Sequence, residues 1–304
     1  MDLDPDLASV VDAVPGWAGK DVRAEVLGGG ITNRNFRLDV DGESFVVRLS
    51  GRDTELLGID REAERLASEA AHRAGVGPEV IAYLPKQRAL ITRFIDAQPL
   101  AAEELEKPEV MEAVVEAVRS IHGMGQIPSA FDAFRVVRDY RDTAEIHGVR
   151  VPATYRQALH AADRIAVAFG RRPVPIRPCH NDLLNANFLL RDGTVVLVDY
   201  EYAGMGDLFF DLGNFSINNA ISEGAEELLL ERYFGSPTPA ARARLKLMKI
   251  MSDFREAMWG VVQQGISTLD FDYVDYADRH FARCLQSAED DRFGMWLDDA
   301  PEDF

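Results

Sequence analysis

Cysteine, positive charge and long apolar runs are all scarce in this chain of 304 residues. Its two cysteines, Cys179 and Cys284, exclude a disulfide framework and a cysteine-based metal site, and they suit a reducing compartment. No apolar run approaches the roughly 20 residues that a membrane span needs. The acidic start of the chain, residues 1–6, lacks the basic segment of a signal peptide. We therefore expect a cytoplasmic protein without membrane insertion.

The 33 lysines and arginines are outnumbered by 51 acidic residues, which gives a formal net charge of -18. Nucleic acids and anionic membrane surfaces both require a basic face, so neither is expected as the main partner. The charge permits a cationic small molecule, although it also serves simply to keep soluble proteins apart. A hydrophobic content of 47% is ample for one large domain or two modest ones.

Most of the chemical information lies in residues 179–202. Two short apolar runs, 188–190 and 195–198, flank the pair Asp192 and Gly193. An Asp-Gly pair between apolar runs is the strongest short-range signal for a two-residue β-hairpin turn. The sequence therefore predicts a hairpin here, with its two strands in a register that the turn fixes.

Oxygen ligands gather at the open end of this predicted hairpin. Counting outward from the turn places Asn187 opposite Val198 and so beside Asp199. Asp182 precedes Asn187 in the pattern His-x-Asp-x-x-x-x-Asn, which starts at His180. In phosphoryl transfer to a hydroxyl, one aspartate accepts the proton while an asparagine and a second aspartate hold Mg²⁺. Each residue alone would pass for an ordinary strand end or loop acid, but the combined spacing favours catalytic roles for Asp182, Asn187 and Asp199.

A glycine-rich loop follows a predicted strand over residues 22–27. It is not a Walker A loop, which requires Gly-Lys-Ser/Thr, but its backbone N–H groups and side chains could approach phosphate oxygens. A second hairpin turn at Asp41 and Gly42 sets Asn35 opposite Arg48, which returns a cation beside the loop. The candidate phosphate-binding residues of the loop are Gly28, Gly29, Gly30, Thr32 and Asn33.

Apolar periodicity predicts a helix over residues 58–74, ended by Gly75. Glu62 and Glu64 lie on opposite flanks of its apolar stripe, so either carboxylate could reach Arg48. Periodicity alone leaves this choice open. Further helices are predicted over residues 5–14, 108–122, 140–146, 153–169, 239–265 and 273–288.

These motifs resemble the catalytic core of the choline/ethanolamine kinase family, within the aminoglycoside-phosphotransferase-like group. The resemblance is carried by residues 180–187 (His-Asn-Asp-Leu-Leu-Asn-Ala-Asn) and 198–204 (Val-Asp-Tyr-Glu-Tyr-Ala-Gly). Residues 259–263 (Trp-Gly-Val-Val-Gln) and 271–277 (Phe-Asp-Tyr-Val-Asp-Tyr-Ala) are similar to the C-terminal signature of that family. The resemblance to this family covers nearly the whole chain. More specifically, the catalytic motif is similar to that of the bacterial choline kinases of lipopolysaccharide and teichoic acid decoration.

The resemblance implies an α+β, two-lobed protein-kinase-like fold. Residues 1–96 would form a small nucleotide-binding lobe with an antiparallel sheet and one helix. Residues 97–304 would form a larger, mostly helical lobe that binds the acceptor and carries the catalytic residues. Asp211, in a second aspartate motif of the family, would brace the catalytic loop. His122, at the end of a predicted helix, is interpreted as a capping or packing residue, and the acidic tail 289–304 is expected to end loosely.

The resemblance also implies ATP and Mg²⁺ as cofactors. Arg48 stands where protein kinases place their strand lysine, and the family pattern Asp-Arg-x-x-Glu assigns its partner to Glu64. Glu201 would assist Asn187 and Asp199 in holding the metal. Backbone groups where the chain crosses between lobes would hold the adenine, at Arg93, Phe94 and Ile95.

For the acceptor, Trp259 occupies the position of an aromatic residue that the family uses around a quaternary ammonium. Val262 stands where the family has a second tryptophan, and Asn218 where eukaryotic choline kinases have a substrate-facing glutamate. Trp259 therefore has plain core packing as an equal alternative. Candidate residues around the acceptor, besides Asp182 and Asn218, are Tyr202, Phe215, Trp259 and Tyr273.

The sequence thus predicts an ATP- and Mg²⁺-dependent kinase for choline, ethanolamine or a similar amino alcohol. Transfer to an aminoglycoside, sugar or other small-molecule hydroxyl is the alternative, and a non-catalytic nucleotide-binding pseudokinase is a weaker one, because Asp182, Asn187 and Asp199 are all present. The sequence allows a monomer or a homodimer, and it leaves the preference for ATP over GTP open.

Overall fold

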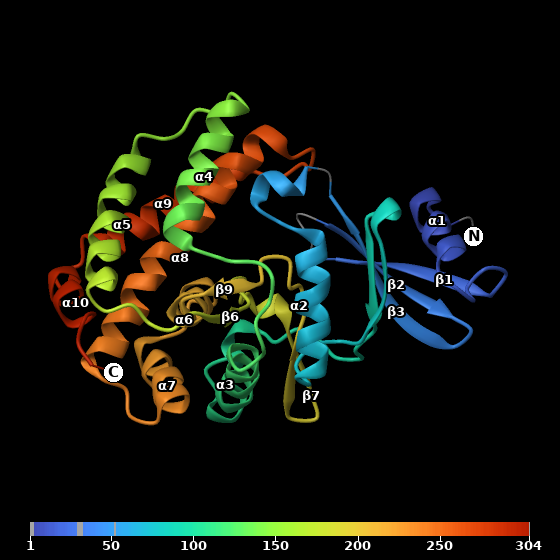
Figure 1. Cartoon of the computed structure of the whole chain (residues 1–304), viewed down its shortest axis with the longest axis horizontal. Coiled ribbons are helices and arrows are strands. Elements are labelled where there is room, and N and C mark those ends of the chain that lie inside the picture. Colours follow the sequence, from blue (N-terminus) through green and yellow to red (C-terminus); the bar gives the residue numbers. More distant parts are fainter. Residues whose placement is uncertain (1–2, 29–32, 52, 304) are drawn as a thin grey trace.

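The computed structural model of the chain describes residues 3–28, 33–51 and 53–303. It has two lobes, with a sheet toward the N-terminus and a larger group of helices toward the C-terminus (Figure 1). Buried apolar residues form two clusters. One lies between the sheet and the first helix, and the other lies among the helices of the larger lobe. This α+β arrangement confirms the predicted fold class. Within the described ranges, every helix is too short or too polar to cross a bilayer.

The sheet has five antiparallel strands in the order β1-β2-β3-β5-β4. Their bounds are Val22–Leu27 (β1), Asn33–Val40 (β2), Glu43–Ser50 (β3), Val80–Leu84 (β4) and Ala89–Arg93 (β5). Asp41 and Gly42 both adopt positive φ in the turn between β2 and β3, as the Asp-Gly signal predicts. The register pairs Asn35 with Arg48, which confirms the predicted position of this cation.

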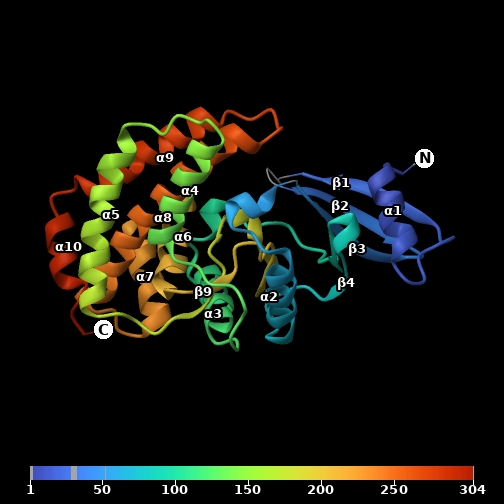
Figure 2. The same ribbon diagram turned by 45° about the horizontal axis from the view of Figure 1, so that its top comes forward.

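The helix α1, Pro5–Ala13, covers one face of the sheet (Figure 2). Its residues Leu7 and Val10 are almost fully buried and belong to the cluster between the sheet and this helix. Trp17 follows the helix and packs on Phe45 of β3, with ring centroids 4.8 Å apart. The N-terminal lobe therefore contains α1, which the apolar pattern predicts, as well as the one helix that the resemblance implies.

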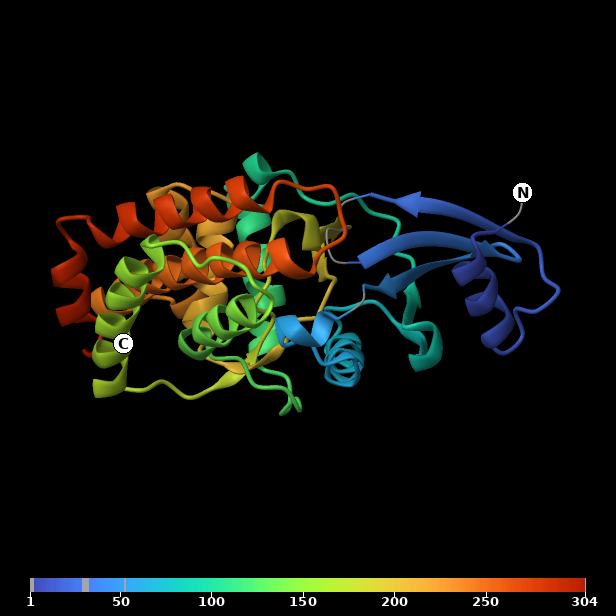
Figure 3. The same ribbon diagram turned by 90° about the horizontal axis from the view of Figure 1, so that it is seen from above.

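The helix α2, Arg61–Arg73, lies between the sheet and the helical lobe in each view (Figures 1 and 3). Asp60 caps its N-terminus by accepting two backbone N–H groups. Ala67 and Ala71 are buried in the same cluster as the C-terminal helices, so this helix packs on the larger lobe. The boundary between lobes near Ala97 stays a prediction.

The helical lobe is built around α8, Pro239–Ile266, which is buried over most of its length. The other helices of this lobe are α3 (Pro108–His122), α4 (Ala133–Ile146), α5 (Thr154–Arg171), α6 (Leu208–Asn218), α7 (Glu223–Phe234), α9 (Tyr273–Ala288) and α10 (Phe293–Asp299). At Gly213 of α6, a Cβ atom would lie 2.7 Å from the backbone of Met248. At Gly260 of α8, a Cβ atom would lie 2.9 Å from the ring of Tyr276. These close approaches fix α6 and α9 against α8.

Two short antiparallel pairs lie in the helical lobe. They are β6 (Arg177–Cys179) with β9 (Gly204–Gly206), and β7 (Phe188–Arg191) with β8 (Thr194–Leu197). Arg191 faces Thr194 across the turn, as predicted. The N–H of Val198 donates to the carbonyl of Asn187 at 3.1 Å, so the predicted pairing at the open end of the hairpin is confirmed.

Two expectations about secondary structure were wrong. The acidic tail does not end loosely, because it forms α10, in which Phe293 and Trp296 are buried against the larger core. Two aromatic anchors outweigh the polar composition of this segment. The helix predicted over residues 140–146 begins earlier, at Ala133, where Asp132 caps it by accepting the N–H of Phe134 at 2.9 Å.

Candidate functional site

A cavity of about 510 Å³ lies between the sheet and the hairpin of the helical lobe. The predicted nucleotide- and metal-binding residues that line it are Gly28, Arg48, Glu64, Arg93, Phe94, Ile95, Asn187 and Asp199. They come from the sheet, α2, the segment after β5 and the β7-β8 hairpin. The predictions for Gly29, Gly30 and Thr32 fall outside the described residues. The structure therefore brings distant parts of the predicted site to a single cavity.

The cation of β3 is held by a carboxylate of α2. Arg48 forms an ion pair with Glu64, and both side chains are at least nine-tenths buried. Glu62 instead points to solvent and pairs with Arg65. The structure therefore decides between the two candidates in favour of Glu64. Arg48 also pairs with Asp199 of the hairpin, which joins the two lobes across the cavity.

A second arginine, Arg61 at the start of α2, connects Asn33 with Glu201, one of the predicted metal ligands. Its guanidinium donates to Glu201 at 3.0 Å, to Glu64 at 2.8 Å and to the Asn33 side-chain oxygen at 3.2 Å. Asn33 in turn donates to Glu201 at 2.9 Å. Burial and the neighbouring Asp199 raise the pKa of Glu201, while the two arginines oppose this shift. Sequence reasoning missed this role, although Arg61 is the arginine of the Asp-Arg-x-x-Glu pattern.

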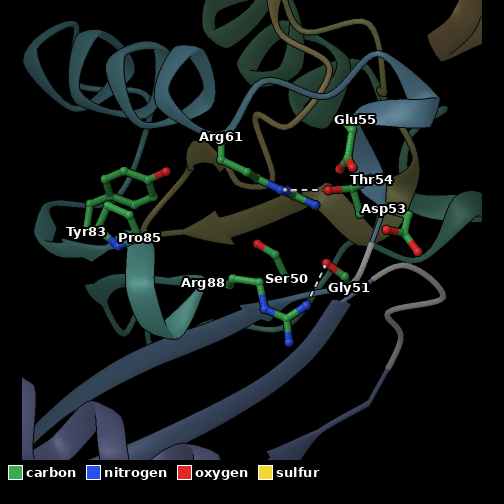
Figure 4. A pocket seen from close by; sticks show the side chains of 9 residues that line it. All are labelled: Ser50, Gly51, Asp53, Thr54, Glu55, Arg61, Tyr83, Pro85 and Arg88. Carbon is green, nitrogen blue, oxygen red and sulfur yellow. Dashed lines mark hydrogen bonds between the residues drawn. The ribbon is translucent and has the colours of Figure 1, made fainter.

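Arg61 also borders a second cavity of about 580 Å³ (Figure 4). There its Nε donates to the Thr54 hydroxyl at 3.3 Å, while Arg88 points toward the Gly51 carbonyl. Asp53 lies on the same wall. Acidic and basic side chains line this cavity together, so its charge favours neither an anionic nor a cationic ligand.

Asp182 lies in the loop that follows β6, and 14% of its side chain is exposed. Its Oδ1 lies 3.9 Å from Nη1 of Arg255, and its carbonyl accepts an N–H of Asn187 at 2.9 Å. Burial raises the pKa of Asp182, and the charge of Arg255 opposes that shift. Asn181 and Asp199 adopt φ of 64° and 67°. Such left-handed conformations in residues other than glycine are typical of functional sites.

The α6 carboxylate of Asp211 is completely buried beneath this loop. It accepts the backbone N–H groups of His180 at 2.8 Å and Asn181 at 2.6 Å, and it contacts Nε2 of His122 at 3.0 Å. These contacts match the expected bracing role of Asp211 and the interpretation of His122 as a packing residue. His180 donates from Nε2 to the Val198 carbonyl at 3.0 Å, and burial lowers the pKa of its ring, which keeps the ring neutral.

Aromatic residues collect around Trp259 on α8. Its Nε1–H donates to the Tyr202 hydroxyl at 3.0 Å, and its ring lies 5.8 Å from that of Tyr273 and 5.4 Å from that of Tyr276. Phe215 packs instead on Phe188, at 5.5 Å between centroids. The structure thus joins Tyr202, Trp259 and Tyr273 as expected, and it adds Tyr276, which sequence reasoning did not single out.

Sequence reasoning also missed Arg255 and Glu256, a buried ion pair next to these aromatic residues. Arg255 donates to the Asn181 carbonyl at 2.8 Å, and its guanidinium stacks at 4.5 Å on the ring of Tyr202. The signal was available, because two adjacent ionisable residues in an otherwise apolar helical stretch are costly to bury without a purpose. Asn218, at the end of α6, is half-buried, and its Nδ2 lacks a partner among the described residues.

The buried Arg48–Glu64 pair lines, with Asn187 and Asp199, a cavity large enough for a nucleotide, and this arrangement suits a phosphotransferase. Comparison with known proteins agrees. Residues 23–248 match the model of the phosphotransferase enzyme family, and the chain belongs to that family.

The relatives identify the branch of the family. A choline/ethanolamine kinase family protein from Mesorhizobium loti has 32% sequence identity and a TM-score of 0.85, over 97% of this chain and 98% of that one. Protein LicA of Haemophilus influenzae is 27% identical over 78% of this chain and 72% of its own length. Ethanolamine kinase 2 of Mus musculus is 27% identical over 86% of this chain and 75% of its own. The predicted family is confirmed, and the chain is a nucleotide-binding phosphotransferase with a hydroxyl acceptor.

The Arg48–Glu64 pair gives a first prediction. Glu64→Gln keeps the shape of the side chain but removes its charge, so Arg48 is no longer held by α2. We expect the KM for ATP to rise and kcat to fall, each by roughly tenfold, because hydrogen bonds to charged groups are the stronger ones. Steady-state kinetics with varied ATP measures both. Glu62→Gln, on the exposed side of the same helix, is the matched control, and equal effects of the two variants would contradict the assignment.

Proposed function

We propose that this protein transfers the γ-phosphoryl group of ATP to the hydroxyl of a small amino alcohol such as choline or ethanolamine. The observation that carries the proposal is the set of contacts of Asp182. Its carbonyl accepts an N–H of Asn187, which lines the nucleotide-sized cavity, and its carboxylate lies 3.9 Å from Arg255, the ionic partner of Glu256 in the aromatic group. The cavity suits a nucleotide as phosphate donor, and the aromatic group with its carboxylate suits a cation. The names of the relatives, choline/ethanolamine kinase and ethanolamine kinase, support the same class of acceptor.

The residues at the lobe junction fit a bound Mg²⁺. Asn187, Asp199 and Glu201 offer hard oxygen ligands. Burial, followed by the charge of Asp199, raises the pKa of Glu201, and a divalent cation stabilises two neighbouring carboxylates that repel each other. We propose that these three side chains hold the metal, which when bound neutralises charge on the nucleotide phosphates.

The chain itself then supplies positioning and charge. Asp182 orients the acceptor hydroxyl and accepts its proton as the oxygen bonds to phosphorus and the bond to ADP breaks. Arg48, held by Glu64, neutralises phosphate charge. Gly28, Asn33 and the rest of the glycine loop would cover the triphosphate. Backbone groups of residues 93–95 would hold the adenine. Because the transition state of phosphoryl transfer is loose, positioning and charge neutralisation provide most of the catalysis.

An acceptor panel tests the proposal. ATP consumption with Mg²⁺ is measured with choline, ethanolamine, related amino alcohols, sugars and several aminoglycosides, and phosphorylated products are identified by mass spectrometry. We expect turnover of an amino alcohol, its loss when EDTA removes Mg²⁺, and none in Asp199→Ala. Turnover restricted to aminoglycosides or sugars would replace the proposed acceptor. Binding of ATP without hydrolysis under any condition would indicate a pseudokinase.

A further inference from the structure

A second carboxylate, besides Asp182, lies among the aromatic residues of the proposed acceptor site. Glu256 of α8 is 5% exposed. Its Oε2 accepts the Tyr276 hydroxyl at 2.7 Å, and its Oε1 pairs with Arg255. An ionised carboxylate has about four acceptor positions, and these contacts use two of them. Glu256 therefore retains the capacity to accept hydrogen bonds from a ligand.

One cation is shared by two carboxylates in this part of the protein. Arg255 pairs with Glu256 and also lies 3.9 Å from Asp182. Its guanidinium stacks on the ring of Tyr202, which accepts a hydrogen bond from Trp259. Two carboxylates that share one guanidinium favour a further positive charge close to them, and a cationic ligand would supply it.

Aromatic faces and carboxylates recognise different kinds of cation. A quaternary ammonium depends on aromatic faces, because it has no N–H to donate. A primary ammonium donates three N–H groups, and a carboxylate such as Glu256 accepts them as charge-assisted hydrogen bonds.

Building on the proposed function, we propose that Glu256 binds the ammonium group of the acceptor directly, and that it selects acceptors whose ammonium carries N–H groups over quaternary ones. The recognition carboxylate is thereby supplied by α8. Tyr276 orients it through its hydroxyl, and Arg255 holds its other oxygen. Glu256 is a residue that determines specificity, while Asp182 retains the chemistry.

The test compares ethanolamine, its N-methylated forms and choline with the full chain. In the wild type, we expect kcat/KM to fall stepwise with methylation, by roughly tenfold or more from ethanolamine to choline. In Glu256→Gln, which keeps the shape and the contacts with neutral partners, we expect kcat/KM for ethanolamine to fall roughly 10- to 100-fold, mainly through KM. The value for choline should change by less than about threefold, so that the preference disappears. Glu62→Gln is the control.

Each outcome decides the inference. Equal losses for ethanolamine and choline in Glu256→Gln, or a wild-type preference for choline, would overturn it while leaving the kinase assignment intact. A wild type that phosphorylates no amino alcohol would overturn the proposed function as well. If Glu256→Gln fails to fold, Tyr276→Phe replaces it, because this variant keeps the ring and removes only the hydroxyl that orients Glu256. It should reduce the preference for ethanolamine roughly threefold, and an unchanged preference would count against the inference.

Discussion

Asp182→Ala is expected to lower turnover of the amino alcohol about 10³-fold and to leave ATP affinity nearly unchanged. The side chain lies 3.9 Å from Arg255 and is absent from the lining of the cavity proposed for the nucleotide. Its loss removes the group that orients the hydroxyl and accepts its proton. Arg255 keeps Glu256 as an ionic partner, so the fold should survive. Turnover is measured by ADP release, and ATP affinity by calorimetric titration.

Asp182→Asn provides the matched variant, since it keeps the shape and removes the basicity. Both variants should be nearly inactive if the carboxylate accepts a proton. Activity near the wild-type level in Asp182→Ala would refute the role. A parallel loss of ATP affinity would instead indicate that Asp182 organises the cleft and takes no direct part in the transfer.

The positions of Asn187 and Asp199 could be predicted because they depend on a local feature. Asp192 and Gly193 fix a two-residue turn, and in an antiparallel hairpin the turn determines every pair outward from it. Arg48 was placed opposite Asn35 for the same reason, from another Asp-Gly turn. The register of a hairpin is set within a dozen residues, which is a range that sequence patterns cover well.

The partner of Arg48 could not be predicted from periodicity, because it depends on how a helix rotates against a sheet. Glu62 and Glu64 flank the same apolar stripe, and only the packing of Ala67 and Ala71 on the larger lobe turns Glu64 inward. The family pattern supplied the choice that the physical pattern left open.

The group of acidic and aromatic residues around Trp259 was even harder to predict from the sequence. Arg255 reaches Asn181 across 74 positions of sequence, and Tyr276 reaches Glu256 only because Gly260 allows α9 to approach α8 closely. Interhelical register follows from side-chain packing, which no local pattern encodes. The helix α6 escaped prediction for a related reason, since it is buried on nearly all sides, including its polar residues Asp211 and Asn214, and so lacks a clear amphipathic period.

The brace beneath the catalytic loop gives the other large expected effect, on stability. Asp211→Ala should lower the free energy of unfolding by about 3–5 kcal/mol, a large part of the 5–15 kcal/mol typical of folded proteins. The variant leaves the buried N–H groups of His180 and Asn181 without their acceptor and removes one of the two partners of the His122 ring. Unfolding by urea, followed by circular dichroism, measures the change.

Asp272→Ala, at the start of α9, is the matched control for Asp211→Ala. Asp272 caps α9 by accepting the N–H of Asp275 at 2.9 Å in an exposed place, and the loss of such a cap costs about 1 kcal/mol. Similar losses in the two variants would show that Asp211 is only another helix residue. A larger loss of stability in Asp211→Ala, together with a stable but inactive Asp182→Ala, would show that the two aspartates have different roles. One holds the loop in place through backbone hydrogen bonds, and the other acts on the acceptor from the loop so held.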